Sequence, residues 1–115
     1  MRRRLLTSVR VFYPRFDRAE LVRRLKERMD ALNERLPLLR VVLFGSYARG
    51  NYTVASDVDL LVVYQGPARE DAFAVVKKVL NIPGLEPHVY SEEEYRQAEQ
   101  RIARMVEGGI DLYPG

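Results

Sequence analysis

The chain has 115 residues, 47% of them hydrophobic and 30% charged, a composition typical of one globular domain and hardly more. It contains no cysteine and one histidine, which excludes disulfides and thiolate zinc sites and argues against an all-protein zinc site. A bound metal should therefore be a hard cation held by oxygen. No apolar run approaches the roughly 18 residues of a membrane span. No apolar stretch follows the basic start, so we expect a cytoplasmic protein with no signal peptide and no membrane contact.

The net charge of +3 is distributed unevenly. Residues 1–40 carry 12 Lys/Arg and 5 Asp/Glu, giving +7, whereas residues 41–115 carry 7 and 11, giving −4. A basic end could attract phosphate-rich partners, but a solvated helix face explains it as well. Because few aromatic residues lie among the basic ones, a nucleic-acid-binding module remains a secondary alternative.

The first predicted elements are a strand and a helix. Val9–Tyr13 is interpreted as a short edge strand that Pro14 ends. A helix is predicted over residues 17–36, with Asp17 as N-cap and Glu20 completing a capping-box pattern. Its apolar residues recur at helical spacing and are Leu21, Leu25, Met29, Leu32 and Leu36. Pro37 should end this helix.

Two strands are predicted next, separated by a polar segment. Val41–Phe44 is a short apolar run that favours a buried strand and ends at Gly45. The polar, glycine-containing segment 47–56 has no strong helical period. Residues 57–64 form the second predicted strand. The relative direction of the two strands is left open by the sequence.

The second half of the chain alternates helix and strand. A helix is predicted over residues 69–81 and a third strand over residues 85–90, which Pro87 assigns to a sheet edge. Ser91 and Glu94 form a second capping-box pattern, which opens a helix to about residue 106. Residues 110–113 are a candidate last strand. The order predicts one α/β domain over residues 1–115, in which helices cover a sheet.

Asp57 and Asp59 open the second strand. Residues i and i+2 of a strand point to the same face, so the two carboxylates should project together and raise each other's pKa. Mg²⁺ is commonly held by one or two carboxylates together with substrate phosphates, and would remove this repulsion. The alternative is an exposed strand end whose aspartates cap backbone amides.

The turn after the first strand is a candidate phosphate site. Gly45 lets a phosphate approach the backbone, Ser46 adds a hydroxyl donor, and exposed amides in such a turn can bind anions. Arg49 could bind phosphate or pair with an aspartate and hold the loop. The alternative is an ordinary strand-ending turn. It is not a P-loop, because no Gly-Lys-Ser/Thr follows.

Together these two segments resemble a known signature. Gly45-Ser46-Tyr47-Ala48-Arg49-Gly50, followed by Ser56-Asp57-Val58-Asp59-Leu60, resembles the nucleotidyltransferases of the DNA polymerase beta superfamily, and most of all their minimal forms. The resemblance implies an α+β nucleotidyltransferase-like fold, with a small mixed sheet flanked by helices. It also implies that Gly45 and Ser46 contact the triphosphate and that Asp57 and Asp59 bind Mg²⁺.

Members of this superfamily usually carry a third carboxylate on a later strand. Glu86 is the candidate, as the only acidic residue of the third predicted strand. The resemblance gives it a catalytic role and a share in a two-metal site. Pro87 departs from the usual pattern and could distort the strand there. His88, two residues after Glu86, could contact the acceptor or a phosphate, or be a surface residue.

The resemblance also implies a reaction and a partner. It predicts transfer of AMP from ATP, or of another nucleotide, to an acceptor hydroxyl. Minimal nucleotidyltransferases are typically encoded beside a small helical HEPN-type protein, and act as its antitoxin by adenylylating it. A HEPN-type toxin is therefore the expected partner. The alternatives are a non-catalytic antitoxin that acts by binding and the basic nucleic-acid-binding module. A homo-oligomer is left open.

Overall fold

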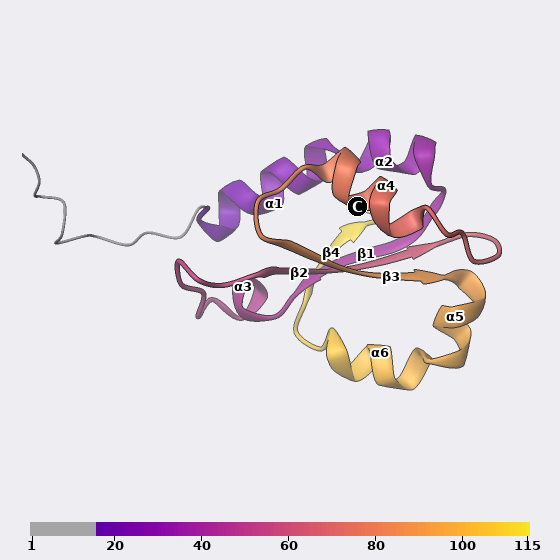
Figure 1. The fold of residues 1–115 in the computed structure, drawn as a ribbon. Helices are drawn as coiled ribbons and strands as arrows, with labels where there is room; N and C mark the ends of the chain where they lie inside the picture. Colours follow the sequence, from indigo (N-terminus) through magenta and orange to yellow (C-terminus); the bar gives the residue numbers. More distant parts are fainter. Residues whose placement is uncertain (1–15) are drawn as a thin grey trace, which may run out of the picture.

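The computed structural model describes residues 16–115, so the strand predicted at Val9–Tyr13 lies outside the described part. Four strands form one sheet, and helices lie on both of its faces (Figure 1). The elements follow in the order α1 (Arg18–Glu27), α2 (Met29–Arg35), β1 (Leu38–Phe44), α3 (Ser46–Arg49), β2 (Val58–Tyr64), α4 (Ala72–Leu80), β3 (Leu85–Ser91), α5 (Glu92–Gln97), α6 (Glu99–Met105) and β4 (Ile110–Tyr113).

The sheet is mixed, with the strand order β3-β2-β1-β4. β1 pairs antiparallel with both β2 and β4, whereas β2 and β3 are parallel. This confirms the expected α+β fold and gives the strand direction that the sequence left open. β3 lies at an edge, as Pro87 predicted, and its register with β2 continues through the pair Leu60 and Pro87. Pro87 therefore does not distort the strand, because an edge strand tolerates a missing donor.

Alternating strand residues face two different helical layers. The larger core cluster joins α1, α2 and α4 to one face of the sheet, through residues such as Leu21, Leu25, Leu32, Val76 and Leu80. The smaller cluster joins α6 to the other face and consists of Val42, Phe44, Leu61, Val63, Ile102 and Val106. Because side chains alternate along a strand, Asp59 lies on the α6 side of β2, the side of Leu61 and Val63.

Both long predicted helices are interrupted. The helix expected over residues 17–36 is divided at Arg28, whose backbone has ψ of 0° and whose guanidinium donates to the Leu80 carbonyl at the end of α4. The helix expected over residues 91–106 is divided at Ala98, whose N–H bonds to the carbonyls of both Glu94 and Tyr95. Neither break has a proline or glycine signal, so tertiary contacts rather than propensity decide it.

Both predicted N-caps form, but only the one at Ser91 is a complete capping box, because the Glu20 carboxylate pairs with Arg23 and Arg24. The Asp17 side chain accepts from the Glu20 N–H at 2.8 Å. At α5 both bonds of the capping box form between Ser91 and Glu94, at 2.8 and 3.2 Å. Within residues 16–115, no helix is long and apolar enough to cross a membrane.

Candidate functional site

The two predicted functional segments meet at one end of the sheet. Phe44, the last residue of β1, lies opposite Asp59 in the antiparallel register. The chain then turns at Gly45 into α3, a single helical turn in the segment expected to be irregular. Antiparallel pairing of β1 and β2 therefore brings the Gly45–Ser46 turn directly against Asp59, although about a dozen residues separate them in sequence.

Gly45 and Asp59 are in close contact. Gly45 has φ of +78° and ψ of −153°, a conformation that side chains rarely adopt. A Cβ built at this position would lie 2.3 Å from the Asp59 Oδ2 atom. Glycine is therefore required here for the backbone conformation and for the space that the carboxylate occupies.

Glu86 lies beside the aspartates. In the parallel pairing of β2 and β3, Glu86 is the direct partner of Asp59. Both residues are on the face of the sheet that α6 covers further along, and the Glu86 side chain is exposed. The structure thus places Glu86 beside Asp59, and Asp57, one residue before β2, is near enough for its charge to act on Asp59. Only the family resemblance had linked Glu86 to the aspartates.

The pKa of Asp59 reflects its burial and its charged neighbours. Partial burial, to a side-chain exposure of 31%, raises its pKa above the ordinary value. His88 opposes the rise, whereas the charges of Asp57 and Glu86 add to it. Folding therefore holds a carboxylate where its charged form is disfavoured, which a bound cation would reverse.

The sequence left open whether His88 belongs to the site or is a surface residue. Its Nε2 atom lies 3.7 Å from Asp59 Oδ1, and its ring packs edge-on against Phe44 with centroids 5.1 Å apart. It therefore belongs to the site and is not an isolated surface residue. Its position two residues after Glu86 was the only signal in the sequence.

The turn that carries Ser46 is closed by backbone bonds. The Arg49 and Gly50 N–H groups donate to the carbonyls of Gly45 and Ser46 at 3.0 and 2.9 Å, and Gly50 has φ of +85°. Ser46 is half-buried and Arg49 is exposed. In residues 16–115, no ion pair joins Arg49 to an acidic side chain. The alternative in which Arg49 pairs with an aspartate and holds the loop is therefore not supported by an ion pair in this part of the chain.

The carboxylates at this end of β2 fit a hard cation that is bound partly by the protein and partly by the substrate. Within the described range, no three His, Asp or Glu side chains converge closely enough to hold a metal alone. Asp57 is exposed and Asp59 partly so, which leaves carboxylate oxygens accessible at one end of β2. At a typical Mg²⁺ site the protein supplies one or two carboxylates, and water and substrate phosphate oxygens supply the remaining ligands.

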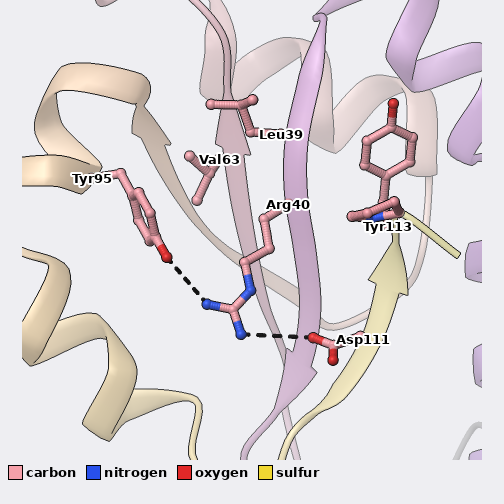
Figure 2. Close-up of a pocket in the computed structure, with 7 residues that line it drawn as sticks. Leu39, Arg40, Val63, Tyr95, Asp111 and Tyr113 are labelled. Atoms are coloured by element: carbon pink, nitrogen blue, oxygen red, sulfur yellow. Dashed lines mark hydrogen bonds and ion pairs between the residues drawn. The ribbon is translucent and has the colours of Figure 1, made fainter.

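A cavity lined by polar and apolar residues lies apart from the candidate site. It has a volume of about 450 Å³ and is bordered by α5, β1 and β4. In Figure 2, Arg40 reaches between Tyr95 and Asp111, donating to the Tyr95 hydroxyl at 3.3 Å and lying 3.7 Å from the Asp111 carboxylate. None of the predicted site residues lines it, and the candidate site lies at the opposite end of β1.

The family model of the nucleotidyltransferase domain matches residues 22–110, which is most of the chain and includes Gly45, Ser46, Asp57, Asp59 and Glu86. The chain belongs to the nucleotidyltransferase domain family. This confirms the resemblance that the two motifs carried.

Two curated relatives come from Methanocaldococcus jannaschii. "Putative protein adenylyltransferase MJ0604" is 46% identical over 41 residues, 34% of this chain and 41% of the relative. "Putative protein adenylyltransferase MJ0141" is 49% identical over 39 residues, 33% of this chain and 39% of the relative. The nucleotidyltransferase domain described here thus matches about two fifths of the length of each.

Solved structures share the fold. A protein described as "a putative nucleotidyltransferase from Sulfolobus solfataricus" superposes with a TM-score of 0.59 at 24% identity, covering 83% of this chain and 81% of that one. A toxin-antitoxin structure with AMP-PNP and a mutant toxin-antitoxin MntA-HpeT give TM-scores of 0.56 and 0.55 at 20% and 18% identity, each over 78% of this chain and 73% of the other.

Proposed function

We propose that this protein transfers AMP from ATP to a hydroxyl group of a partner protein, with Mg²⁺ as cofactor. The observation that supports this most is the position of Asp59, which lies against Gly45 of the turn on one side and beside Glu86 of β3 on the other. Phosphate binding and charge neutralisation at one point are the requirements of nucleotidyl transfer.

Each residue has a separate task in this proposal. Asp57 and Asp59 would hold Mg²⁺, which when bound neutralises charge on the triphosphate. Gly45 leaves room for a phosphate beside the backbone, Ser46 donates its hydroxyl to a phosphate oxygen, and the exposed Arg49 binds another. Glu86 shares in the metal site and accepts the proton of the attacking hydroxyl.

The reaction balances as a single displacement. The acceptor oxygen forms a bond to the α-phosphorus, and the bond from that phosphorus to the bridging oxygen of the β-phosphate breaks. The acceptor proton passes to Glu86, and pyrophosphate leaves. The products are an adenylylated acceptor and pyrophosphate.

The exposure of the site supports a protein acceptor. Asp57 and Glu86 are exposed, and β3 is an edge strand, so the site opens at the border of the sheet. A residue on the surface of a second protein can approach from there. The names of the two archaeal relatives point to protein adenylylation, and those of two structural neighbours to toxin-antitoxin pairs. We therefore propose a HEPN-type toxin as acceptor and an antitoxin role for this chain.

The test is transfer of radiolabel from ATP in the presence of Mg²⁺ to the product of the neighbouring gene, or to a protein in lysate. We expect label on one protein from the α-phosphate and none from the γ-phosphate. Asp57→Asn and Asp59→Asn should abolish labelling, whereas Asp111→Asn, at an exposed carboxylate of β4 that pairs with Arg40, should not.

Binding of the neighbour with no transfer would reject catalysis for that pair and leave the binding-only antitoxin as the better account. Steeply salt-dependent RNA binding that persists without Mg²⁺ would instead favour the nucleic-acid-binding module.

A further inference from the structure

We infer that Arg18, at the start of α1, is a positioning residue that holds the Gly45–Gly50 turn in shape for the nucleotide. The inference rests on the proposed function for its consequence, because that function assigns this turn to the triphosphate. Arg18 is exposed and lies about thirty residues before the turn in sequence, so no motif points to it.

The turn needs support from outside. α3 has only four residues, Ser46–Arg49, between two glycines that both have positive φ. The first turn of a helix is the costly step in its formation, because several residues are fixed for a single hydrogen bond. Glycines on both sides add further backbone freedom to the unfolded turn. Such a turn keeps one geometry only where neighbouring elements hold it.

Arg18 makes one contact with its side chain. Its Nη1 atom donates to the Ala48 carbonyl at 2.9 Å. Carbonyls in the last turn of a helix have no partner within the helix, and a cation there also interacts favourably with the helix dipole. A Cβ built on Gly50 would lie 3.5 Å from the same nitrogen, so the guanidinium also lies close to the end of the turn.

Arg18 makes a second contact with its backbone. As the first residue of α1 its N–H has no acceptor within that helix, and it donates instead to the Tyr52 hydroxyl at 3.1 Å. The Tyr52 ring stacks on Tyr47, with centroids 4.4 Å apart and planes 11° apart. Tyr47 belongs to α3 and is 2% exposed. The backbone N–H and the guanidinium of Arg18 thus both connect α1 to the turn at residues 45–50, the first through Tyr52 and Tyr47 and the second directly.

Arg18 contacts the turn near its end, at the Ala48 carbonyl, and makes no hydrogen bond or ion pair with Asp57, Asp59 or Glu86 among the described residues. Ala48 and Gly50 lie toward its end, whereas Gly45 begins it and contacts Asp59. Arg18 therefore acts on the nucleotide through the turn and not by touching it. Its loss should weaken nucleotide binding more than it slows the chemical step.

The experiment compares Arg18→Ala with Arg23→Ala. Arg23 is also an exposed arginine of α1, but its ion pairs are with Glu20 and Glu27 of the same helix. We expect Arg18→Ala to raise the KM for ATP, and the Kd for AMP-PNP by calorimetry, about tenfold, because a hydrogen bond from a charged group is lost. The kcat should change much less. Arg18→Lys should restore part of the affinity and Tyr52→Phe should lose part of it.

Hydrogen exchange provides a readout that needs no nucleotide. The amides of Gly50 and Asn51 both donate to the Ser46 carbonyl, so they report on the closed turn. Arg18→Ala should speed their exchange severalfold, whereas Arg23→Ala should leave it at the wild-type rate.

The outcomes separate the two proposals. Equal KM and equal exchange in Arg18→Ala and Arg23→Ala would overturn the role of Arg18. A fall in kcat with KM unchanged would also overturn it. If the wild type binds no nucleotide, the proposed function fails instead, and exchange alone decides whether Arg18 holds the turn.

Discussion

At the scale of single residues, the site depends on how closely side chains and backbone approach one another. Gly45, Asp59 and His88 lie in direct succession, with the aspartate between the glycine and the imidazole. Such contacts fix the carboxylate in place, so substitutions here should affect its position as well as its charge.

Gly45→Ala should destabilise the protein and abolish nucleotidyl transfer. The unusual backbone conformation costs an alanine about 1–3 kcal/mol, and the new methyl group would collide with Asp59. Gly66→Ala is the matched control, because Gly66 has φ of +89° but no heavy atom lies within 4 Å of the place its methyl group would take. Urea denaturation and labelling assays measure both. Equal losses of stability in the two variants would contradict the contact with Asp59.

Asp59→Asn should change stability and activity in opposite directions. Burial raises the pKa of Asp59, so folding disfavours its charged form, and the neutral amide removes that cost at neutral pH. We expect a higher Tm than the wild type in EDTA, with no transfer activity. Asp57→Asn at the exposed neighbour should leave the Tm in EDTA nearly unchanged. A lower Tm for Asp59→Asn would show that the carboxylate stabilises the fold without metal.

Glu86→Gln should lower kcat by about 10²- to 10⁴-fold if Glu86 accepts the acceptor proton, because that is the usual contribution of a general base. Binding of AMP-PNP should be weakened far less. Exposed Glu93, in the first turn of α5, provides the control substitution Glu93→Gln. A kcat unchanged in Glu86→Gln would remove this residue from the catalytic step.

At the scale of elements, β3 and α5 form a continuous unit, because the last residue of the strand is the N-cap of the helix. Ser91 is 1% exposed, and the capping box satisfies both its N–H and that of Glu94. This unit holds one end of β3, while Glu86 lies near the other and His88 in the middle.

Ser91→Ala should lower the free energy of unfolding by about 0.5–2 kcal/mol, because the Glu94 N–H loses its acceptor. Denaturation in urea measures this loss. Since Ser91 is far along β3 from Glu86, the KM for ATP should stay at the wild-type value. A large change in KM with little change in stability would mean that the cap also positions the site.

At the scale of the whole molecule, two apolar layers lie on opposite faces of one sheet. Leu25 belongs to the layer of α1, α2 and α4, and Ile102 to the layer of α6, and both are fully buried. Asp59 and Glu86 are on the α6 side of strands that also pack against the other layer. The position of the site therefore depends on both layers.

Leu25→Ala and Ile102→Ala should each cost about 2–5 kcal/mol, the usual loss for a buried aliphatic side chain. Because the strands are shared, both variants should shift one common unfolding transition, observed together by circular dichroism and tyrosine fluorescence. Two separate transitions would contradict the expectation of a single domain.

Local patterns in the sequence determined the type of most described elements and the cap at Ser91. These features depend on residues a few positions apart, whose side chains repeat with the period of a helix or a strand. The motif in residues 45–60 likewise carried the family, which the domain match confirmed.

Only the tertiary structure decided the features that join distant parts of the chain. These are the antiparallel β1 and β2, the parallel β3 that places Glu86 beside Asp59, the helix breaks at Arg28 and Ala98, and the contact of Arg18 with Ala48. Such contacts depend on how whole apolar faces pack, and packing overrides local propensity where the two conflict. No spacing along the chain encodes them, because each joins residues that are neighbours only after the sheet has formed.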